Sequence, residues 1–112
     1  MRRCLIVTDG FYEWKKLDSA AAEAAPFGNR GPMLMAGFAG VRKSPDGWIR
    51  SCTIITTEAN ELVAKMHDRM PAIVAPDDYA SLGEEPASPN QRKAMLRPYP
   101  ADRLAHVAST EL

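Results

Sequence analysis

Short apolar runs separated by turn-forming residues recur along the chain, a pattern typical of strands. The first run, residues 4–7, leads into the turn residues Thr8-Asp9-Gly10. Alternation over residues 11–15 then predicts a second strand, with a bend at Gly10. The start of the chain therefore predicts two strands in close succession.

The middle of the chain predicts a loop followed by a hairpin. Residues 17–32 are rich in Pro, Gly and Asn, which favours a long loop. Residues 33–41 predict a strand whose glycines, Gly37 and Gly40, mark bends or the close approach of another backbone. Ser44-Pro45-Asp46-Gly47 is a turn sequence, so we expect it to join this strand to the apolar run that follows.

Helical signals are confined to short segments. Thr57 is a plausible N-cap, and apolar residues at helical spacing from Ala59 to Met66 predict one short amphipathic helix. Ser88-Pro89-Asn90-Gln91 has the capping-box arrangement and starts a helix that runs to about Leu96. The other expected elements are a brief strand at 72–74, a short helix at 76–82 and a final strand at 104–108.

Composition adds limits to this picture. The 112 residues fit one α+β domain, residues 1–112, and the 14 basic and 14 acidic residues balance, which argues against high affinity for nucleic acid. No apolar run is long enough for a membrane span and the start is no signal peptide, so we expect a cytoplasmic location. Two histidines and two scattered cysteines form no close-set ligand pair, so we expect neither a metal nor another cofactor.

Two residues able to transfer protons stand in unusual surroundings. Glu13 lies between aromatic residues in the run Asp9-Gly10-Phe11-Tyr12-Glu13-Trp14, and His67 follows the expected helix and precedes Pro71. Alternation puts Glu13 on the same strand face as Phe11, away from open water. A carboxylate and an imidazole brought together perform acid–base chemistry near neutral pH. We therefore expect Glu13 and His67 to face a common cleft.

Both residues also have plain structural interpretations. Most glutamates are solvated, so Glu13 fits a surface strand equally well, paired with Lys15 or Arg3. A histidine after a helix commonly hydrogen-bonds the last carbonyls and offsets the helix dipole, which would account for His67. The residues alone leave these alternatives open.

Tyr12, Trp14 and the two cysteines also have both a structural and a functional interpretation. Tyr12 and Trp14 have faces that stack on bases, but core packing is the favoured interpretation for both. Cys4 and Cys52 adjoin apolar residues, so we expect both to be buried core thiols rather than nucleophiles.

Five sequence blocks occur in a fixed order along the chain. They are Arg3-Cys4-Leu5-Ile6, Asp9-Gly10-Phe11-Tyr12-Glu13-Trp14, Ile54-Ile55-Thr56-Thr57-Glu58-Ala59-Asn60, His67-Asp68-Arg69-Met70-Pro71 and Leu96-Arg97-Pro98-Tyr99-Pro100-Ala101-Asp102. On these blocks the chain resembles the SOS response-associated peptidase family, whose members are abasic-site processing proteins. The resemblance implies an open-barrel-like fold of antiparallel strands with short peripheral helices and a groove across one side.

The resemblance also implies roles for four residues. Glu13 and His67 would be catalytic, with Glu13 acting in acid–base chemistry at the damaged sugar and His67 assisting proton transfer around the sugar oxygen. Arg69 would contact a backbone phosphate and the Thr56 hydroxyl would lie near the lesion. The structural alternatives are an Arg69–Asp68 surface ion pair and, for Thr56, helix capping.

One departure from the family concerns the nucleophile. Family members begin Met-Cys-Gly-Arg and, after loss of Met, the amine and thiol of the N-terminal Cys trap the abasic sugar as a thiazolidine. This chain begins Met1-Arg2. We therefore expect no nucleophile in this chain, and truncation at the N-terminus and slightly at the C-terminus relative to the family.

The implied function is abasic-site processing in single-stranded DNA, a peptidase- or hydrolase-type activity that crosslinks DNA to protein in the SOS response and DNA repair. We expect this chain by itself to be inactive. The alternatives are a non-covalent single-stranded DNA binding module and an inactive remnant of the family. An incomplete domain exposes apolar surface, so self-association is a further expectation.

Overall fold

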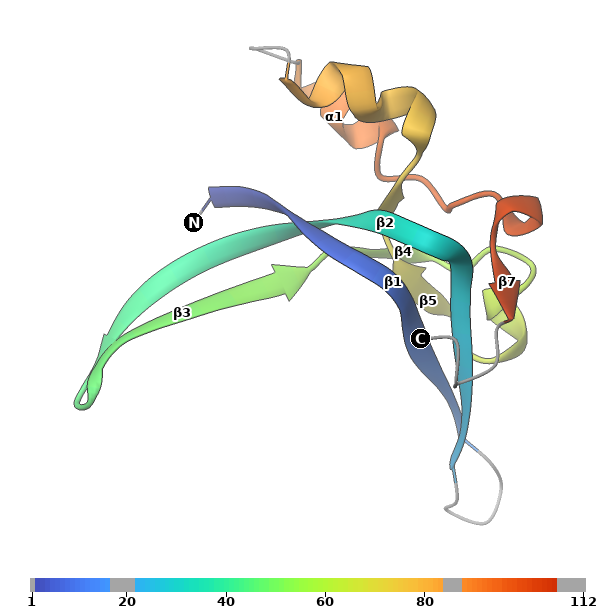
Figure 1. The fold of residues 1–112 in the computed structure, drawn as a ribbon, viewed down its shortest axis with the longest axis horizontal. Helices are drawn as coiled ribbons and strands as arrows, with labels where there is room; N and C mark the ends of the chain where they lie inside the picture. Colours follow the sequence, from blue (N-terminus) through green and yellow to red (C-terminus); the bar gives the residue numbers. More distant parts are fainter. Residues whose placement is uncertain (1, 17–21, 84–87, 107–112) are drawn as a thin grey trace.

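Three antiparallel strands form the main sheet, in the order β1 (Arg2–Lys16), β2 (Ala22–Ser44) and β3 (Gly47–Ile54). The structure is a computed structural model that describes residues 2–16, 22–83 and 88–106. Two short strands, β6 (Ile73–Val74) and β7 (Ala105–His106), pair with separate parts of β2. The long strand β2 therefore organises the sheet, which stays open rather than closing into a barrel (Figure 1).

The start of the chain forms one bent strand instead of the two that the sequence predicts. The pairing of β1 with β2 shifts register between Thr8 and Gly10, which confirms the predicted bend. The Thr8 hydroxyl donates to the Gly10 carbonyl at 2.6 Å and accepts from the Gly10 N–H at 3.2 Å. The side chain of Thr8 thus satisfies backbone groups where the ladder is interrupted, so the strand continues through the turn residues.

The predicted loop over residues 17–32 is wrong from Ala22 onward, where β2 begins. Phe27 lies opposite Phe11, their rings stack at 5.6 Å, and Phe27 is only 1% exposed. Burial of this aromatic side chain outweighs the turn preference of the neighbouring Pro and Gly residues. Residues 17–21 of the predicted loop lie outside the described residues.

The predicted helix from Ala59 to Met66 is also wrong. Thr56–Glu58 forms a strand, β4, paired with β5 (Arg69–Pro71), and only Val63–Lys65 forms a 3-10 turn, η1. The Asn60 side chain accounts for this, because its Oδ1 accepts from the backbone N–H groups of residues 62 and 63 at 3.1 and 2.9 Å. A side chain that binds these donors starts a tight turn, and the threonine expected as the cap lies in β4.

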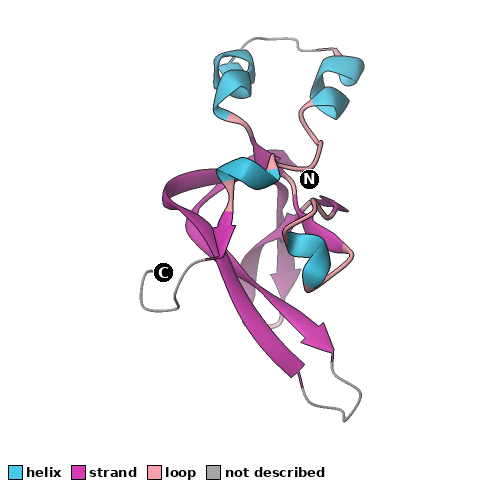
Figure 2. Cartoon of the chain, turned by 90° about the vertical axis from the view of Figure 1, so that its right-hand side faces the viewer, coloured by secondary structure: helices cyan, strands magenta, loops and turns pink. Residues whose placement is uncertain are grey.

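Other predicted elements are confirmed. The Ser44–Gly47 turn joins β2 to β3, with Gly47 at φ 124°. The Ser88–Gln91 capping box starts α1 (Pro89–Ala94), and the expected helix before it is the 3-10 segment η2 (Pro76–Gly83). A last 3-10 turn, η3 (Ala101–Arg103), precedes β7, and residues 107 and 108 of the expected final strand lie outside the described residues. Helical segments stand above the sheet in Figure 2.

The core lies where β1, β2 and the β4–β5 region meet, on one side of the sheet. The largest fully buried side chains come from β2, η1 and β5, and they are Phe27, Met33, Met35, Val63 and Met70. Ile6, Phe11, Ala59, Leu62 and Met66 pack against this cluster. The fold class is therefore α+β, as predicted, in a single small domain with few short helices.

Candidate functional site

Glu13 lies in β1 with its side chain partly buried, on the strand face of Phe11. Desolvation by this burial raises the pKa of Glu13 above its ordinary value, while the charge of His67 and a hydrogen bond from the Trp14 N–H act in the opposite direction. An effect of His67 on the pKa of Glu13 requires the two groups to lie close together. The structure thus brings the carboxyl group and the imidazole close enough to interact electrostatically, although they lie 54 positions apart in the sequence.

The aromatic neighbours of Glu13 are exposed, and the predicted core packing of both is wrong. Tyr12 is 48% exposed and Trp14 is 57% exposed. The cause is the alternation of β1, which turns Phe11 and Glu13 towards the core and the other two side chains outward. Two aromatic rings therefore flank the candidate acid at the surface.

Backbone groups and a carboxylate hold the His67 ring in place. Its Nδ1 accepts a hydrogen bond from the Arg69 N–H at 3.0 Å, and lies 3.2 Å from the Arg69 carbonyl oxygen and 3.3 Å from Asp68 Oδ1. Without a proton Nδ1 accepts from the Arg69 N–H, and with a proton it donates to the carbonyl or the carboxylate, in the neutral ring as well as in the charged one. Both protonation states have partners on this side, which leaves Nε2 for other interactions.

Arg69 and Thr56 contact each other across the β4–β5 pair. The guanidinium donates through Nη2 to the Thr56 carbonyl at 2.7 Å and to its hydroxyl at 3.1 Å, and through Nε to the same hydroxyl at 3.3 Å. The capping alternative for Thr56 is wrong, because Thr56 begins a strand. Asp68 lies against His67, and among the described residues it forms no ion pair with Arg69. Two predicted DNA-binding residues thus form one exposed unit beside His67.

Asn60 positions this region, and the sequence interpretation missed it. Its Nδ2 donates to the Tyr99 carbonyl at 2.7 Å, and its backbone N–H contacts Met70 Sδ at 3.3 Å. Together with the Oδ1 bonds that start η1, these contacts fix the chain between β4 and His67. The signal that identifies it is an Asn placed immediately before a tight turn, where its side chain commonly binds the backbone.

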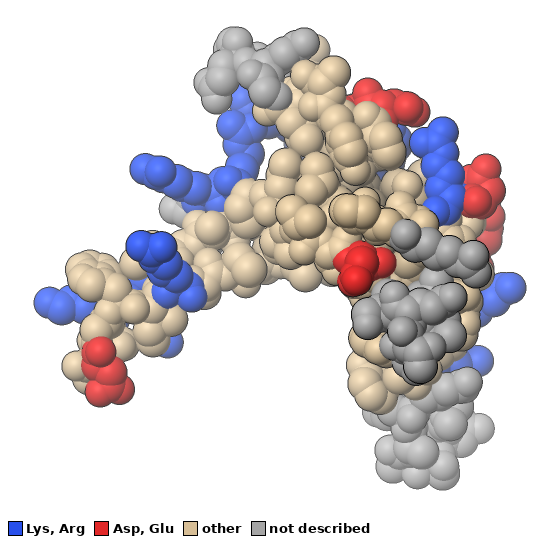
Figure 3. Space-filling view, viewed as in Figure 1, with Lys and Arg blue, Asp and Glu red and all other residues tan. Residues whose placement is uncertain are grey.

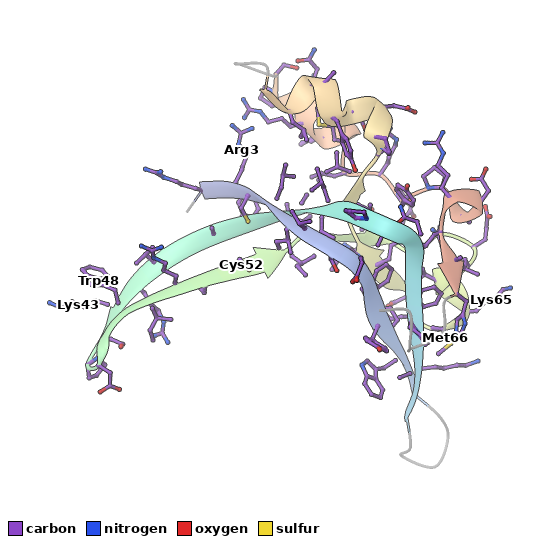
Figure 4. The ribbon with its side chains drawn as sticks, in the orientation of Figure 1. Arg3, Lys43, Trp48, Cys52, Lys65 and Met66 are labelled. Atoms are coloured by element: carbon purple, nitrogen blue, oxygen red, sulfur yellow. The ribbon has the colours of Figure 1, made fainter. Side chains whose placement is uncertain are left out.

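The cysteines differ from the predicted buried thiols. Cys52 is exposed on β3, so that prediction is wrong, and Cys4 is only partly buried in β1. Cys4 lines an open groove of about 960 Å³ whose lining also includes Arg3, Phe38 and Arg92, but neither Glu13 nor His67. Figure 4 labels Cys52 on the β2–β3 pair and Met66, the neighbour of His67, on the other side of the molecule.

Neither a candidate metal site nor a membrane-spanning helix occurs in the described part of the chain. No group of three or more His, Cys, Asp or Glu residues in it is placed to hold a metal ion. None of its helices has the length and apolarity to cross a membrane.

An open, mostly antiparallel sheet with a few short helices defines a small α+β domain. The family described as SOS response associated peptidase (SRAP) matches residues 1–111, and the chain belongs to that family. The resemblance seen in the five sequence blocks is thereby confirmed.

Known relatives of the chain are named as abasic site processing proteins. The chain is 41% identical over 108 residues to the abasic site processing protein YoaM of Bacillus subtilis, covering 92% of this chain and 47% of YoaM. It is 33% identical over 131 residues to the abasic site processing protein HMCES of Gallus gallus, covering 97% of this chain and 39% of HMCES. The chain thus spans less than half the length of these relatives.

The fold is also found in a solved structure of a protein from Bacteroides thetaiotaomicron. The two superimpose with a TM-score of 0.79 at 22% identity, over 93% of this chain and 47% of the other. This similarity concerns the fold alone.

Proposed function

We propose that this chain supplies the acid–base part of a site that processes abasic sites in single-stranded DNA. Glu13 and His67 form the proton-transferring pair, and Arg69 and Thr56 contact the DNA. The observation that carries the proposal is the electrostatic coupling of a partly buried carboxyl group to an imidazole that is 45% exposed. The relatives named as abasic site processing proteins supply the substrate class.

The proposed chemistry is the opening of the abasic sugar ring. Opening breaks the bond between C1′ and the ring oxygen, puts a proton on that oxygen and removes the proton of the C1′ hydroxyl to give an aldehyde. A raised pKa favours the protonated carboxyl group, which is the form that donates, and the Nε2 of a neutral imidazole receives a proton when Nδ1 carries the ring proton. Glu13 donates to the ring oxygen and His67 receives the hydroxyl proton, so the proton count balances.

The DNA would lie across the exposed groups around this pair. Hydrogen bonds to Thr56 use Nε and Nη2 of Arg69, which leaves Nη1 to bind a phosphate oxygen. The exposed rings of Tyr12 and Trp14 offer faces on which unpaired bases stack. A flanking ring and a fixed guanidinium would hold the sugar against Glu13.

We place the nucleophile of the full reaction outside these 112 residues. In the family, covalent trapping uses the amine and thiol of an N-terminal Cys to form a thiazolidine. Cys52 lies on the β2–β3 pair, away from Met66, the residue that precedes His67 in the sequence (Figure 4). Neither cysteine of this chain is proposed to attack the sugar.

The test supplies the missing nucleophile as a reagent. An abasic oligonucleotide is incubated with a saturating aminooxy probe, which captures only the open aldehyde, so capture reports ring opening. The chain should accelerate capture, and Glu13→Gln or His67→Asn should reduce that acceleration about tenfold or more, since a positioned acid or base contributes roughly 10²–10⁴. Arg69→Ala should raise the DNA concentration needed for half-maximal effect.

Two controls define what contradicts the proposal. A tetrahydrofuran analogue has no hydroxyl at C1′ and should bind without any capture. Glu61→Gln changes an exposed carboxylate elsewhere and should leave the acceleration intact. Binding to the oligonucleotide with no acceleration would favour the non-covalent binding module, and neither binding nor acceleration would favour an inactive remnant.

A further inference from the structure

One part of the molecule has no core. We define the arm as β3 together with the β2 segment paired with it, Gly37–Ser44. In Figure 1 the arm projects away from the rest of the chain. All eight residues of β3 are exposed, and within the described part of the chain β3 pairs with β2 alone, so its outer edge is free.

Large apolar side chains occupy both faces of the arm. Register places Val41, Trp48 and Ile54 on one face, and Phe38 and Ile49 on the other. All five are exposed, with Trp48 at 70% (Figure 4). A two-stranded ribbon is marginally stable in water, and apolar groups on both faces require cover on both faces.

Overall dimensions show that the exposed surface is large. The radius of gyration is 15.9 Å, against about 13 Å for a compact chain of this length. The accessible surface is 7834 Å², whereas a folded monomer of 12.3 kDa exposes about 6,100 Å². The excess of about 1,700 Å² on one partner exceeds the roughly 800 Å² per partner of a standard interface and lies in the range of obligate assemblies.

We infer that the arm is the docking surface for a polypeptide equivalent to the part of the relatives that this chain does not match. The matched region is 47% of YoaM and 47% of the Bacteroides thetaiotaomicron chain, so in both proteins more than half of the polypeptide accompanies this fold. A polypeptide of that length is able to cover both faces of the arm and add a strand to its free edge.

A second copy of the chain or single-stranded DNA would cover less of the apolar surface of the arm. A second copy joined edge to edge pairs the free strands but leaves Trp48 and Ile49, on opposite faces, uncovered. Single-stranded DNA matches Arg42, Lys43 and Arg50 but does not bury apolar side chains on two faces. In Figure 3 the basic side chains are spread over the molecule rather than gathered on the arm. From Arg42, Lys43 and Arg50 we instead expect acidic residues at the rim of the docked polypeptide.

The test needs no DNA, so it is independent of the proposed function. The full 112-residue chain is co-expressed with the unmatched part of YoaM as a separate tagged polypeptide, and YoaM's own matched segment serves as positive control. We expect a one-to-one complex in which β3 amides exchange at least tenfold more slowly than in the isolated chain. Ile49→Asp should abolish capture, whereas Tyr79→Asp should not, since these side chains are 39% and 38% exposed and Tyr79 lies on η2.

A chimera covers the case in which the YoaM part does not fold alone. In it, this chain replaces the matched segment of YoaM, and β3 exchange is compared with that of the isolated chain. Slower exchange in the chimera supports the inference. Unchanged exchange in the chimera overturns it, as does an isolated chain that dimerises and protects β3, or protection of β3 by single-stranded DNA alone.

Discussion

The region around Glu13 and the arm are built from the same long strand, yet only one of them has a core. In the first region Phe27, Met33 and Met35 of β2 are almost fully buried, because β1 and the β4–β5 region cover them. Further along the same strand Val41 is 61% exposed. An apolar residue in a strand is buried only where another layer lies over it, so the strand pattern alone does not locate the core.

This difference separates two roles. The buried region fixes the candidate acid, base and guanidinium, since each is carried by a strand or turn attached to the core. The arm contributes nothing to that core, and its side chains are available to a partner. Substitutions should therefore lower the free energy of unfolding strongly in the first region and only slightly in the arm.

The largest expected effect contrasts two aromatic side chains. Phe27→Ala removes a buried ring that stacks on Phe11 at 5.6 Å and contacts His106 edge-on at 5.5 Å. We expect a loss of about 3–5 kcal/mol in the free energy of unfolding, measured by denaturant titration. Trp48→Ala on the arm should change it by under about 0.5 kcal/mol. Equal losses would mean that the arm is already packed in the isolated chain.

A smaller effect is expected where the arm joins the core, from a pair of glycines. A Cβ on Gly37 would lie 2.6 Å from the Thr53 carbonyl oxygen, whereas a Cβ on Gly40 meets nothing within 4 Å. Gly37→Ala should therefore cost about 1–3 kcal/mol, because backbone has to move. Gly40→Ala should stay within about 0.5 kcal/mol of the wild-type chain by the same titration. A neutral Gly37→Ala would show that β3 is free to move away from β2.

The glycines also illustrate what the sequence predicts. Strand glycines at 37 and 40 indicate close approach or a bend, and the structure shows close approach at Gly37 alone. The turn at Ser44–Gly47 and the cap at Ser88 were predictable because each depends on a few neighbouring residues. Turns and caps of this kind are predictable because the residues that form them are neighbours in the sequence.

The predictions of secondary structure are wrong where contacts between residues distant in the sequence determine the conformation. Residues 22–32 carry turn formers but become strand, because Phe27 packs on Phe11 and His106. Residues 59–66 have helical spacing, but the Asn60 side chain and the pairing of β4 with β5 leave only one turn. For the candidate site, alternation predicted the face of Glu13, whereas the contact of Arg69 with Thr56 depends on strand register that no local pattern contains.

Asn60 gives a third, smaller contrast within the core region. Asn60→Ala removes the acceptor that starts η1 and the donor to the Tyr99 carbonyl, and should cost about 1–2 kcal/mol. Asn60→Asp keeps the acceptor and loses only the donor, so it should retain more stability than the Ala variant. Thermal unfolding followed by circular dichroism compares the two. Equal loss in both variants would assign the whole effect to the Tyr99 contact.

The smallest expected effect concerns the ionisation of Glu13. Burial raises the pKa of Glu13 in the folded chain above its ordinary value of 4.5, so the folded state binds this proton more tightly than the unfolded state does. Stability from this group is therefore present below pH 4.5 and is lost as the pH rises through the raised folded value. Glu13→Gln stays neutral, so its stability should exceed that of the wild-type chain above this window, with a flatter pH dependence across it.

Unfolding curves recorded across mildly acidic to neutral pH measure this difference. Glu61→Gln removes an exposed carboxylate and controls for the change in net charge. His67→Asn removes the charge that lowers the pKa of Glu13, so the window should move to higher pH. Parallel curves for the wild-type chain and Glu13→Gln would mean that Glu13 is solvated like any surface carboxylate. That result would remove the desolvated acid on which ring opening depends, while leaving the arm and its partner untouched.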